Sequence, residues 1–245
     1  MSNALLKGLD VLRCFTQERR TLSASEIARM TGMPQPTAWR VCKALESQGY
    51  LVTEQDGKYR PGLEVLNLGY AALNTMNIAA LAAPDLQSLS DSLKGTAGLS
   101  TPEGASMLFL QRCEAAGAIL NYNMKGGVMV PIGNSASGWA YLSLLSDDQR
   151  DAALKQLRAS DPTHAQLADR HLAGAIRQFR SSGFVINDEV FYPGLLSIAV
   201  PFRSSRRGSY YVVSCTAMKT AFESLPAIEQ AAQQLLELGA RLADI

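Results

Sequence analysis

The chain has 245 residues, of which 47% are hydrophobic and 18% are charged, a composition typical of a folded globular protein and not of a disordered or fibrous one. Its 23 basic and 22 acidic residues nearly cancel, so net charge alone does not indicate a nucleic-acid partner. No apolar run approaches the roughly twenty residues that span a bilayer, which excludes an integral membrane protein.

The first residues do not have the pattern of a signal peptide, because Lys7, Asp10 and Arg13 interrupt the apolar positions. We therefore expect a cytoplasmic protein with no membrane contact. The four cysteines are far apart and include no C-x-x-C pair, which favours buried, reduced thiols over a zinc site or a disulfide framework. At about one to two hundred residues per domain, the length suggests two domains.

Three helices are predicted in the first fifty residues. Leu5, Leu9, Leu12 and Phe15 recur at helical spacing and predict a first helix with one buried stripe. The segment Ser23-Ala-Ser-Glu26 has the pattern of a capping box and predicts the start of a second helix, which ends at Gly32.

A third helix is predicted from about Pro36 to Gln48, with Ala38, Val41, Cys42 and Leu45 on one face and Arg40, Lys43 and Ser47 on the other. The segment 51–60 then predicts two short strands joined by a turn at Asp56-Gly57. Three helices followed by a two-stranded wing indicate a winged helix-turn-helix.

In such a module the third helix enters the major groove of DNA. An arginine pairs with guanine and a glutamine with adenine, so Arg40 and Gln35 are candidates for base contacts. Thr37, Lys43, Lys58 and Arg60 are candidates for phosphate contacts, which set register without reading sequence. The excess of nine basic over six acidic residues in 1–60 is mild, and a small helical domain for protein contact is the alternative.

These segments resemble the winged helix-turn-helix of the IclR family of bacterial transcription regulators. The resemblance rests on residues 4–15, 25–34 and 37–51 and covers the whole first domain. It implies a DNA-binding domain over residues 1–62, a linker helix over 63–83 that packs against a dimer mate, and a GAF-like effector-binding domain over 84–245. The implied partners are double-stranded operator DNA, a small-molecule effector and a second copy, as a homodimer or a dimer of dimers.

The pattern of the remaining chain agrees with an α+β domain. Leu63, Leu66 and Leu73 predict a helix that ends at Pro84. Short β-rich stretches are predicted as strands, and helices are expected between and after them, one beginning at the capping box Ser146-Asp-Asp-Gln149 and the last covering about Leu225 to Ala243. The predicted strands are 106–111, 118–122, 184–187, 196–202 and 210–216. This grouping indicates a mostly antiparallel sheet covered by helices.

Three stretches match the segments that form the effector pocket in the family: 133–139, 187–197 and 214–216. The candidate effector-binding residues taken from them are Ser135, Ala136, Ser137, Gly138, Trp139, Asn187, Leu195, Ser197, Ser214 and Thr216. Independently of the resemblance, the start of a helix near Ser135 would present unpaired backbone N–H groups to a carboxylate. The alternative for the hydroxyl groups is ordinary bonding to neighbouring backbone.

The chain departs from the family pattern at three places. Trp139 replaces the usual lysine, Asn187 an aspartate and Ser197 a cysteine. Loss of a cation and an acid, with gain of an indole ring, suggests a pocket that binds by stacking and hydrogen bonding, so that an aromatic acid or an amide is the expected effector. Alternatively, Trp139 belongs to the core.

No catalytic residues, metal ligands or cofactor motif are recognisable. His164 and His171 are too far apart to share a metal, and no cysteine or acidic cluster accompanies them. An enzyme acting on the same ligand would need an activated nucleophile or base, which is not visible. An architectural DNA binder would need a larger positive excess. A ligand-responsive regulator without catalytic activity is therefore preferred over both alternatives.

Overall fold

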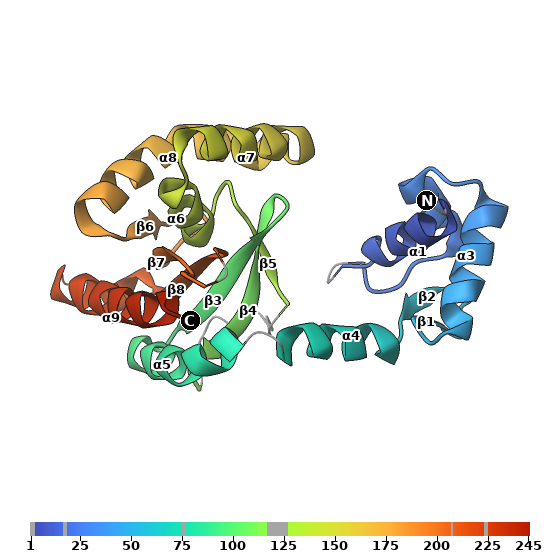
Figure 1. The fold of residues 1–245 in the computed structure, drawn as a ribbon, viewed down its shortest axis with the longest axis horizontal. Coiled ribbons are helices and arrows are strands. Elements are labelled where there is room, and N and C mark those ends of the chain that lie inside the picture. The colour runs from blue at the N-terminus through green and yellow to red at the C-terminus, as the bar shows by residue number, and fades with distance from the viewer. Residues whose placement is uncertain (1–2, 17–18, 75–76, 117–126, 207, 223–224) are drawn as a thin grey trace. The chain divides into compact units, whose positions relative to one another are not determined.

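The computed structural model describes residues 3–16, 19–74, 77–116, 127–206, 208–222 and 225–245. The chain forms two compact units, residues Met1–Thr75 and Met76–Ile245 (Figure 1). The boundary lies earlier than the 83/84 limit expected for the second domain. Each unit is described separately below.

The first unit has the predicted helices and wing. Its elements are α1 (Asn3–Arg13), α2 (Ala24–Thr31), α3 (Gln35–Ser47), β1 (Leu51–Thr53), β2 (Tyr59–Pro61) and α4 (Leu63–Asn74). The capping box is formed, because the Glu26 backbone N–H donates to Ser23 Oγ at 3.2 Å and the Ser23 N–H donates to Glu26 Oε2 at 2.8 Å. Gly32 ends α2 in the left-handed conformation, with φ of 68°.

The buried side of α1 differs from the predicted stripe. Val11 and Cys14 pack in the core of the unit with Ile27, whereas Leu5 and Leu9 are 69% and 43% exposed. The leucine spacing correctly predicted a helix, but periodicity does not say which of two apolar sides faces the core of the same chain. Leu12 and Phe15 are partly buried and pack against this core, so the predicted buried stripe is confirmed for these two residues and was wrong for Leu5 and Leu9.

The prediction that Pro84 ends the linker helix was also wrong. Two helices are described here, α4 and then α5 (Asn77–Leu93), and Pro84 lies inside α5. Proline at this position removes one backbone hydrogen bond. Burial of Ala82, Leu86 and Leu89 against the sheet offsets that loss, and α5 consequently belongs to the second unit.

The second unit is built on a six-stranded, wholly antiparallel sheet with the order β5-β4-β3-β8-β7-β6. The strands are β3 (Thr96–Glu103), β4 (Ser106–Glu114), β5 (Met129–Pro131), β6 (Val185–Asp188), β7 (Leu195–Arg203) and β8 (Tyr210–Met218). Four of them confirm predicted strands, and β3 and β5 were not predicted. The predicted strand at 118–122 lies outside the described residues.

Helices cover both faces of the sheet (Figure 1). One face packs on α5 and on α9 (Leu225–Ala243), and the core there includes Leu86, Ile198 and Leu235. The other face packs on α6 (Ala136–Leu144) and α8 (Pro162–Ser182), with α7 (Asp147–Ser160) beside α8; its core includes Met107, Leu142 and Val212. A 3-10 helix, Lys219–Phe222, follows β8. The predicted mixed α+β class and antiparallel sheet are confirmed.

The capping box predicted at Ser146 is present at the start of α7. All four cysteines are unpaired and buried. Within the described ranges, no helix is both long enough and apolar enough to cross a membrane.

Candidate functional site

Helix α3 places a polar, cationic face on the surface of the first unit. Ala38 and Cys42 are fully buried against the core, whereas Trp39, Arg40 and Lys43 are exposed. Burial also raises the pKa of the Cys42 thiol to about 11, so this group stays protonated at neutral pH. The predicted division of α3 into an inner and an outer face is therefore confirmed.

The candidate base-reading residues differ in what they contact. The Gln35 amide donates to Ser25 Oγ at 2.9 Å, which ties the start of α3 to α2. Thr37, a candidate for a phosphate contact in the first turn of α3, is half-buried. Among the described residues, no carboxylate lies within ion-pair distance of the exposed Arg40, so its guanidinium is available to an external acceptor.

Three of the four candidate phosphate-contacting residues are each paired with an acid. Lys43 Nζ lies 2.7 Å from Glu46 Oε2 and Lys58 Nζ lies 3.5 Å from Asp56 Oδ2, while Arg60 pairs with Glu54. The hydrogen bond with Lys43 lowers the pKa of Glu46 and raises that of Lys43. Exposed pairs of this kind contribute at most about 1 kcal/mol, so a DNA phosphate can displace the carboxylate.

Trp39 is a surface residue that the sequence interpretation did not include. Its side chain is 51% exposed beside Arg40, on the same face of α3 as Lys43. An exposed indole on a groove-reading helix can make apolar contacts with thymine methyl groups. Its position four residues before Lys43, which places both on one helix face, was the one available signal.

An apolar groove of about 730 Å³ lies between α1 and α3 and extends to Leu68 of α4. The outward-facing Leu5 and Leu9 line it, together with Val41 and Leu45. On α4, Leu63, Leu66 and Leu68 are each more than half exposed. Exposed apolar surface of this extent is typical of interaction sites.

A cavity of about 70 Å³ lies in the second unit between the sheet and the start of α6. It is lined by seven of the ten candidate effector-binding residues: Ser135, Ala136, Ser137, Leu195, Ser197, Ser214 and Thr216. Segments far apart in the sequence therefore meet at one place, as the family resemblance implied.

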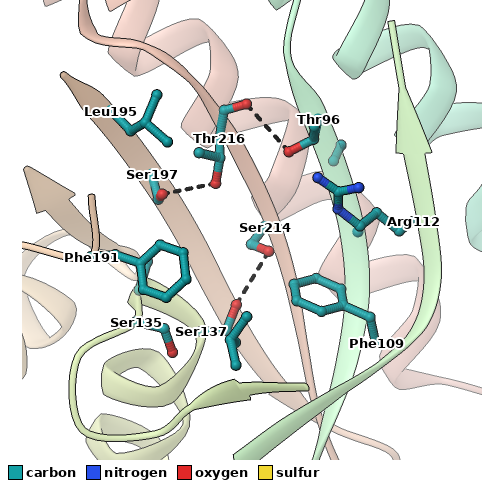
Figure 2. A pocket seen from close by; sticks show the side chains of 14 residues that line it. Thr96, Phe109, Arg112, Ser135, Ser137, Phe191, Leu195, Ser197, Ser214 and Thr216 are labelled. Atoms are coloured by element: carbon teal, nitrogen blue, oxygen red, sulfur yellow. Dashed lines mark hydrogen bonds between the residues drawn. The ribbon is translucent and has the colours of Figure 1, made fainter. Parts of the chain in front are cut away.

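The hydroxyl groups in the cavity bond mainly to one another (Figure 2). Ser197 Oγ lies 2.8 Å from Thr216 Oγ1, and Ser137 Oγ donates to Ser214 Oγ at 3.2 Å. Paired hydroxyl groups can rotate to donate to a ligand or accept from it. By contrast, the hydroxyl group of Ser135 donates to the Pro131 backbone carbonyl at 2.7 Å, as the alternative expected.

The first turn of α6 borders the cavity. Ser135 caps the helix, because its Oγ accepts from the Gly138 N–H at 3.1 Å. The N–H groups of Ala136 and Ser137 also lie in this turn and have no acceptor within the helix. Both residues line the cavity, so these two N–H groups are placed to bind a ligand oxygen.

Three candidate residues do not line the cavity. Gly138 is used by the cap, and Trp139 packs in the core, where its indole N–H donates to the Gly133 carbonyl at 2.8 Å and its ring stacks on His171. The Asn187 side chain donates to the Asn134 carbonyl at 2.8 Å and accepts from the Phe191 N–H at 3.0 Å. Asn187 therefore joins the two loops that flank the cavity and does not face a ligand itself.

The aromatic and charged residues of the cavity were missed by the sequence interpretation. Phe109 and Phe191 supply the rings expected from Trp139, and Arg112 supplies a cation from β4. Thr96 of β3 also lines the cavity, and its hydroxyl donates to the Thr216 carbonyl at 3.4 Å. Two of these four residues lie on β4, whose sequence does not alternate polar and apolar positions and so does not show which of its side chains line a cavity.

Clusters of three or more metal-ligating side chains are absent from the part of the chain that the structure describes. Residues 4–55 match the family description "IclR helix-turn-helix domain". Residues 70–242 match "Bacterial transcriptional regulator IclR C-terminal". The two matches together cover both structural units.

Similar proteins are named as regulators. The chain is 29% identical over 200 residues to the Pca regulon regulatory protein of Pseudomonas putida, covering 81% of this chain and 68% of that protein. It matches the crystal structure of an IclR family transcriptional regulator from Brucella abortus with a TM-score of 0.88 and 28% identity, over 99% of this chain and 92% of that one. An IclR homolog from Microbacterium hydrocarbonoxydans, complexed with 4-hydroxybenzoate, shares the fold with a TM-score of 0.74 at 24% identity, over 98% of each chain.

Proposed function

Because the chain belongs to the IclR family of bacterial transcriptional regulators and carries its helix-turn-helix, we propose that it is a one-component regulator whose operator binding responds to a small organic effector. The observation that carries this proposal is the coexistence of an exposed cationic helix in one unit with a lined cavity in the other. The relatives are regulators and not enzymes, so the catalytic alternative has no support.

For the DNA contact, α3 enters the major groove and Arg40 and Gln35 read base edges, while Thr37, Lys43, Lys58 and Arg60 bind phosphates. Action on chromosomal DNA places the protein in the cytoplasm. The exposed leucines of α1 and α4 support a homodimer, or a dimer of dimers, on a pseudo-palindromic operator. In this assembly a second copy covers the groove.

For the effector, the cavity binds a small organic acid or amide, aromatic or aliphatic. The Ser197–Thr216 and Ser137–Ser214 hydroxyl pairs and the first turn of α6 supply hydrogen bonds. An effector changes operator affinity only by the ratio of its own affinities for the two arrangements of the dimer, typically about 5- to 150-fold. A change in operator affinity of this size on addition of the effector is the expected response.

The assignment of DNA contacts is tested by comparing Arg40→Ala with Lys58→Ala. A site is first selected from genomic fragments, and affinities are then measured on it and on random duplex at several salt concentrations. Arg40→Ala should cost about 1 to 3 kcal/mol on the selected site and relax its sequence preference. Lys58→Ala should weaken both duplexes similarly and lower the salt slope by about 1. Equal losses on both duplexes in both variants would contradict the assignment.

The effector site is tested by the double variant Ser214→Ala/Thr216→Ala. We expect it to lose the effector response in calorimetry while operator binding persists. If the double variant binds the effector with unaltered affinity, the ligand lies elsewhere.

A further inference from the structure

Arg112 is a nearly buried cation in the wall of the cavity. Its side chain is only 8% exposed, and of the described residues that line the cavity it alone carries a formal charge. Figure 2 shows its guanidinium beside Thr96, on the same side of the cavity as the Phe109 ring. A charge in such a position is costly unless a partner of opposite sign stands next to it.

The sheet register places Arg112 and Ser214 on either side of a glycine. Gly98 of β3 is directly opposite Arg112 of β4 and also directly opposite Ser214 of β8. Neighbouring strands lie about 4.8 Å apart, so the backbones at Arg112 and Ser214 are separated by about 10 Å. A Cβ atom at Gly98 would lie 2.6 Å from the Phe109 ring. The absence of a side chain at Gly98 makes room for the Phe109 ring, which lies over this glycine and forms part of the cavity wall together with Arg112 and Ser214.

Glu114 pairs with Arg112 from two positions along the same strand and is partly exposed, at 34%. This pair offsets the buried charge. A guanidinium has five N–H donors in a planar fork, so it can bind a ligand carboxylate in addition to Glu114 or in exchange for it. A neutral amide has one acceptor oxygen and no negative charge, so it cannot form the bidentate ion pair that a carboxylate forms with a guanidinium.

We propose that Arg112 binds the carboxylate of the effector, and that a second oxygen atom of the effector binds the Ser137–Ser214 pair at the start of α6. This inference rests on the proposed function and narrows its effector to acids that carry a further hydroxyl, carbonyl or carboxyl group. The orientation follows from charge, because Arg112 offers a full positive charge and a helix N-terminus only about half of one.

The experiment measures binding of three acids and their neutral amides to the full chain by calorimetry. The pairs are pyruvate with pyruvamide, succinate with succinamide, and 4-hydroxybenzoate with 4-hydroxybenzamide. We expect at least one acid to bind the wild-type protein and to change operator affinity, with its amide binding at least about tenfold more weakly. Arg112→Gln should remove this difference between acid and amide.

Glu114→Gln is the second variant, because Arg112→Gln also breaks an ion pair and could weaken folding. Removal of the competing carboxylate should strengthen acid binding severalfold and leave amide binding unchanged. A purely structural Arg112–Glu114 pair would alter unfolding but not the ratio of acid to amide affinity.

Two results would overturn the inference in different ways. If acids and amides bind equally, or if Arg112→Gln keeps the preference for acids, Arg112 does not bind the effector, although the proposed function stands. If none of the six compounds binds the wild-type protein, the proposed effector response fails, and the role of Arg112 fails with it.

Discussion

Individual residues determine which molecules fit the cavity. Its volume of about 70 Å³ is roughly half of the 150 Å³ known to hold a benzene molecule. A short aliphatic acid therefore fits with little change, whereas a ring requires displacement of neighbouring side chains. We expect Phe191 to be the side chain that a ring displaces. It lines the cavity from the loop between β6 and β7 and not from a strand.

Phe191→Ala should shift the preference of the cavity toward rings. We expect the affinity for 4-hydroxybenzoate, relative to that for pyruvate, to rise about tenfold, because loss of the phenyl group provides the missing volume. Competition calorimetry measures this ratio. Phe222→Ala is the matched control, since Phe222 is buried in the core on the other face of the sheet. An equal change of the ratio in both variants would show a general loosening instead.

Residue-level roles were only partly predictable. Ser135, Ser137 and Ser214 line the cavity, because the resemblance located their segments, and their role in binding an effector stays a prediction. Arg112 was missed because β4 does not alternate polar and apolar positions: the pairing with β3 shifts its register between Leu99 and Ser100, so the sequence does not show which side chains of β4 line a cavity. Trp139 was misassigned to the effector, because a core tryptophan at a helix start has the same local sequence as one facing a ligand.

At the scale of elements, the sequence correctly predicted features in which side chains bond to backbone groups only three residues away. Both capping boxes formed as predicted. By contrast, β3 contains Gly98, Ser100 and Pro102, which have poor strand propensity. It is a strand because β4 and β8 pair with it on both sides. Likewise, Pro84 continues a helix because tertiary burial outweighs its local cost. Such long-range pairing is not visible in a single sequence.

Removal of the first cap should destabilise only the DNA-binding unit. We expect Ser23→Ala to lower the free energy of unfolding by about 1 kcal/mol, because the N–H of Glu26 loses its acceptor. Hydrogen exchange should increase in peptides of α2 and α3. Ser146→Ala, which removes the same motif from α7, is the control and should increase exchange only in the second unit. If Ser146→Ala also increased hydrogen exchange in α2, the two units would not unfold independently.

At the scale of the whole molecule, the proposed operator binding depends on the assembly of two chains. The leucines of α1 and α4 are costly to leave in water, and we proposed that a second copy covers them. Because Leu5 and Leu9 are exposed in the single chain, charges placed there should disturb the assembly more than the fold.

The double variant Leu5→Glu/Leu9→Glu should therefore lower the mass measured by sedimentation equilibrium and weaken operator binding by at least about tenfold, since half-site affinities no longer combine. Met129→Glu is the control, because Met129 is 49% exposed and lies in the second unit. A double variant that keeps the wild-type mass would place the dimer contact outside the groove.

The chain has two tryptophans, and each structural unit holds one. Trp39 is in contact with solvent on α3, while Trp139 is sealed in a dry environment beside His171. Their emission should differ in colour, red-shifted for the first and blue-shifted for the second. The unmodified protein therefore carries two built-in fluorescent reporters, one on the helix that we propose to enter the DNA groove and the other sensitive to unfolding of the second unit, and both can be recorded in a single titration without any label.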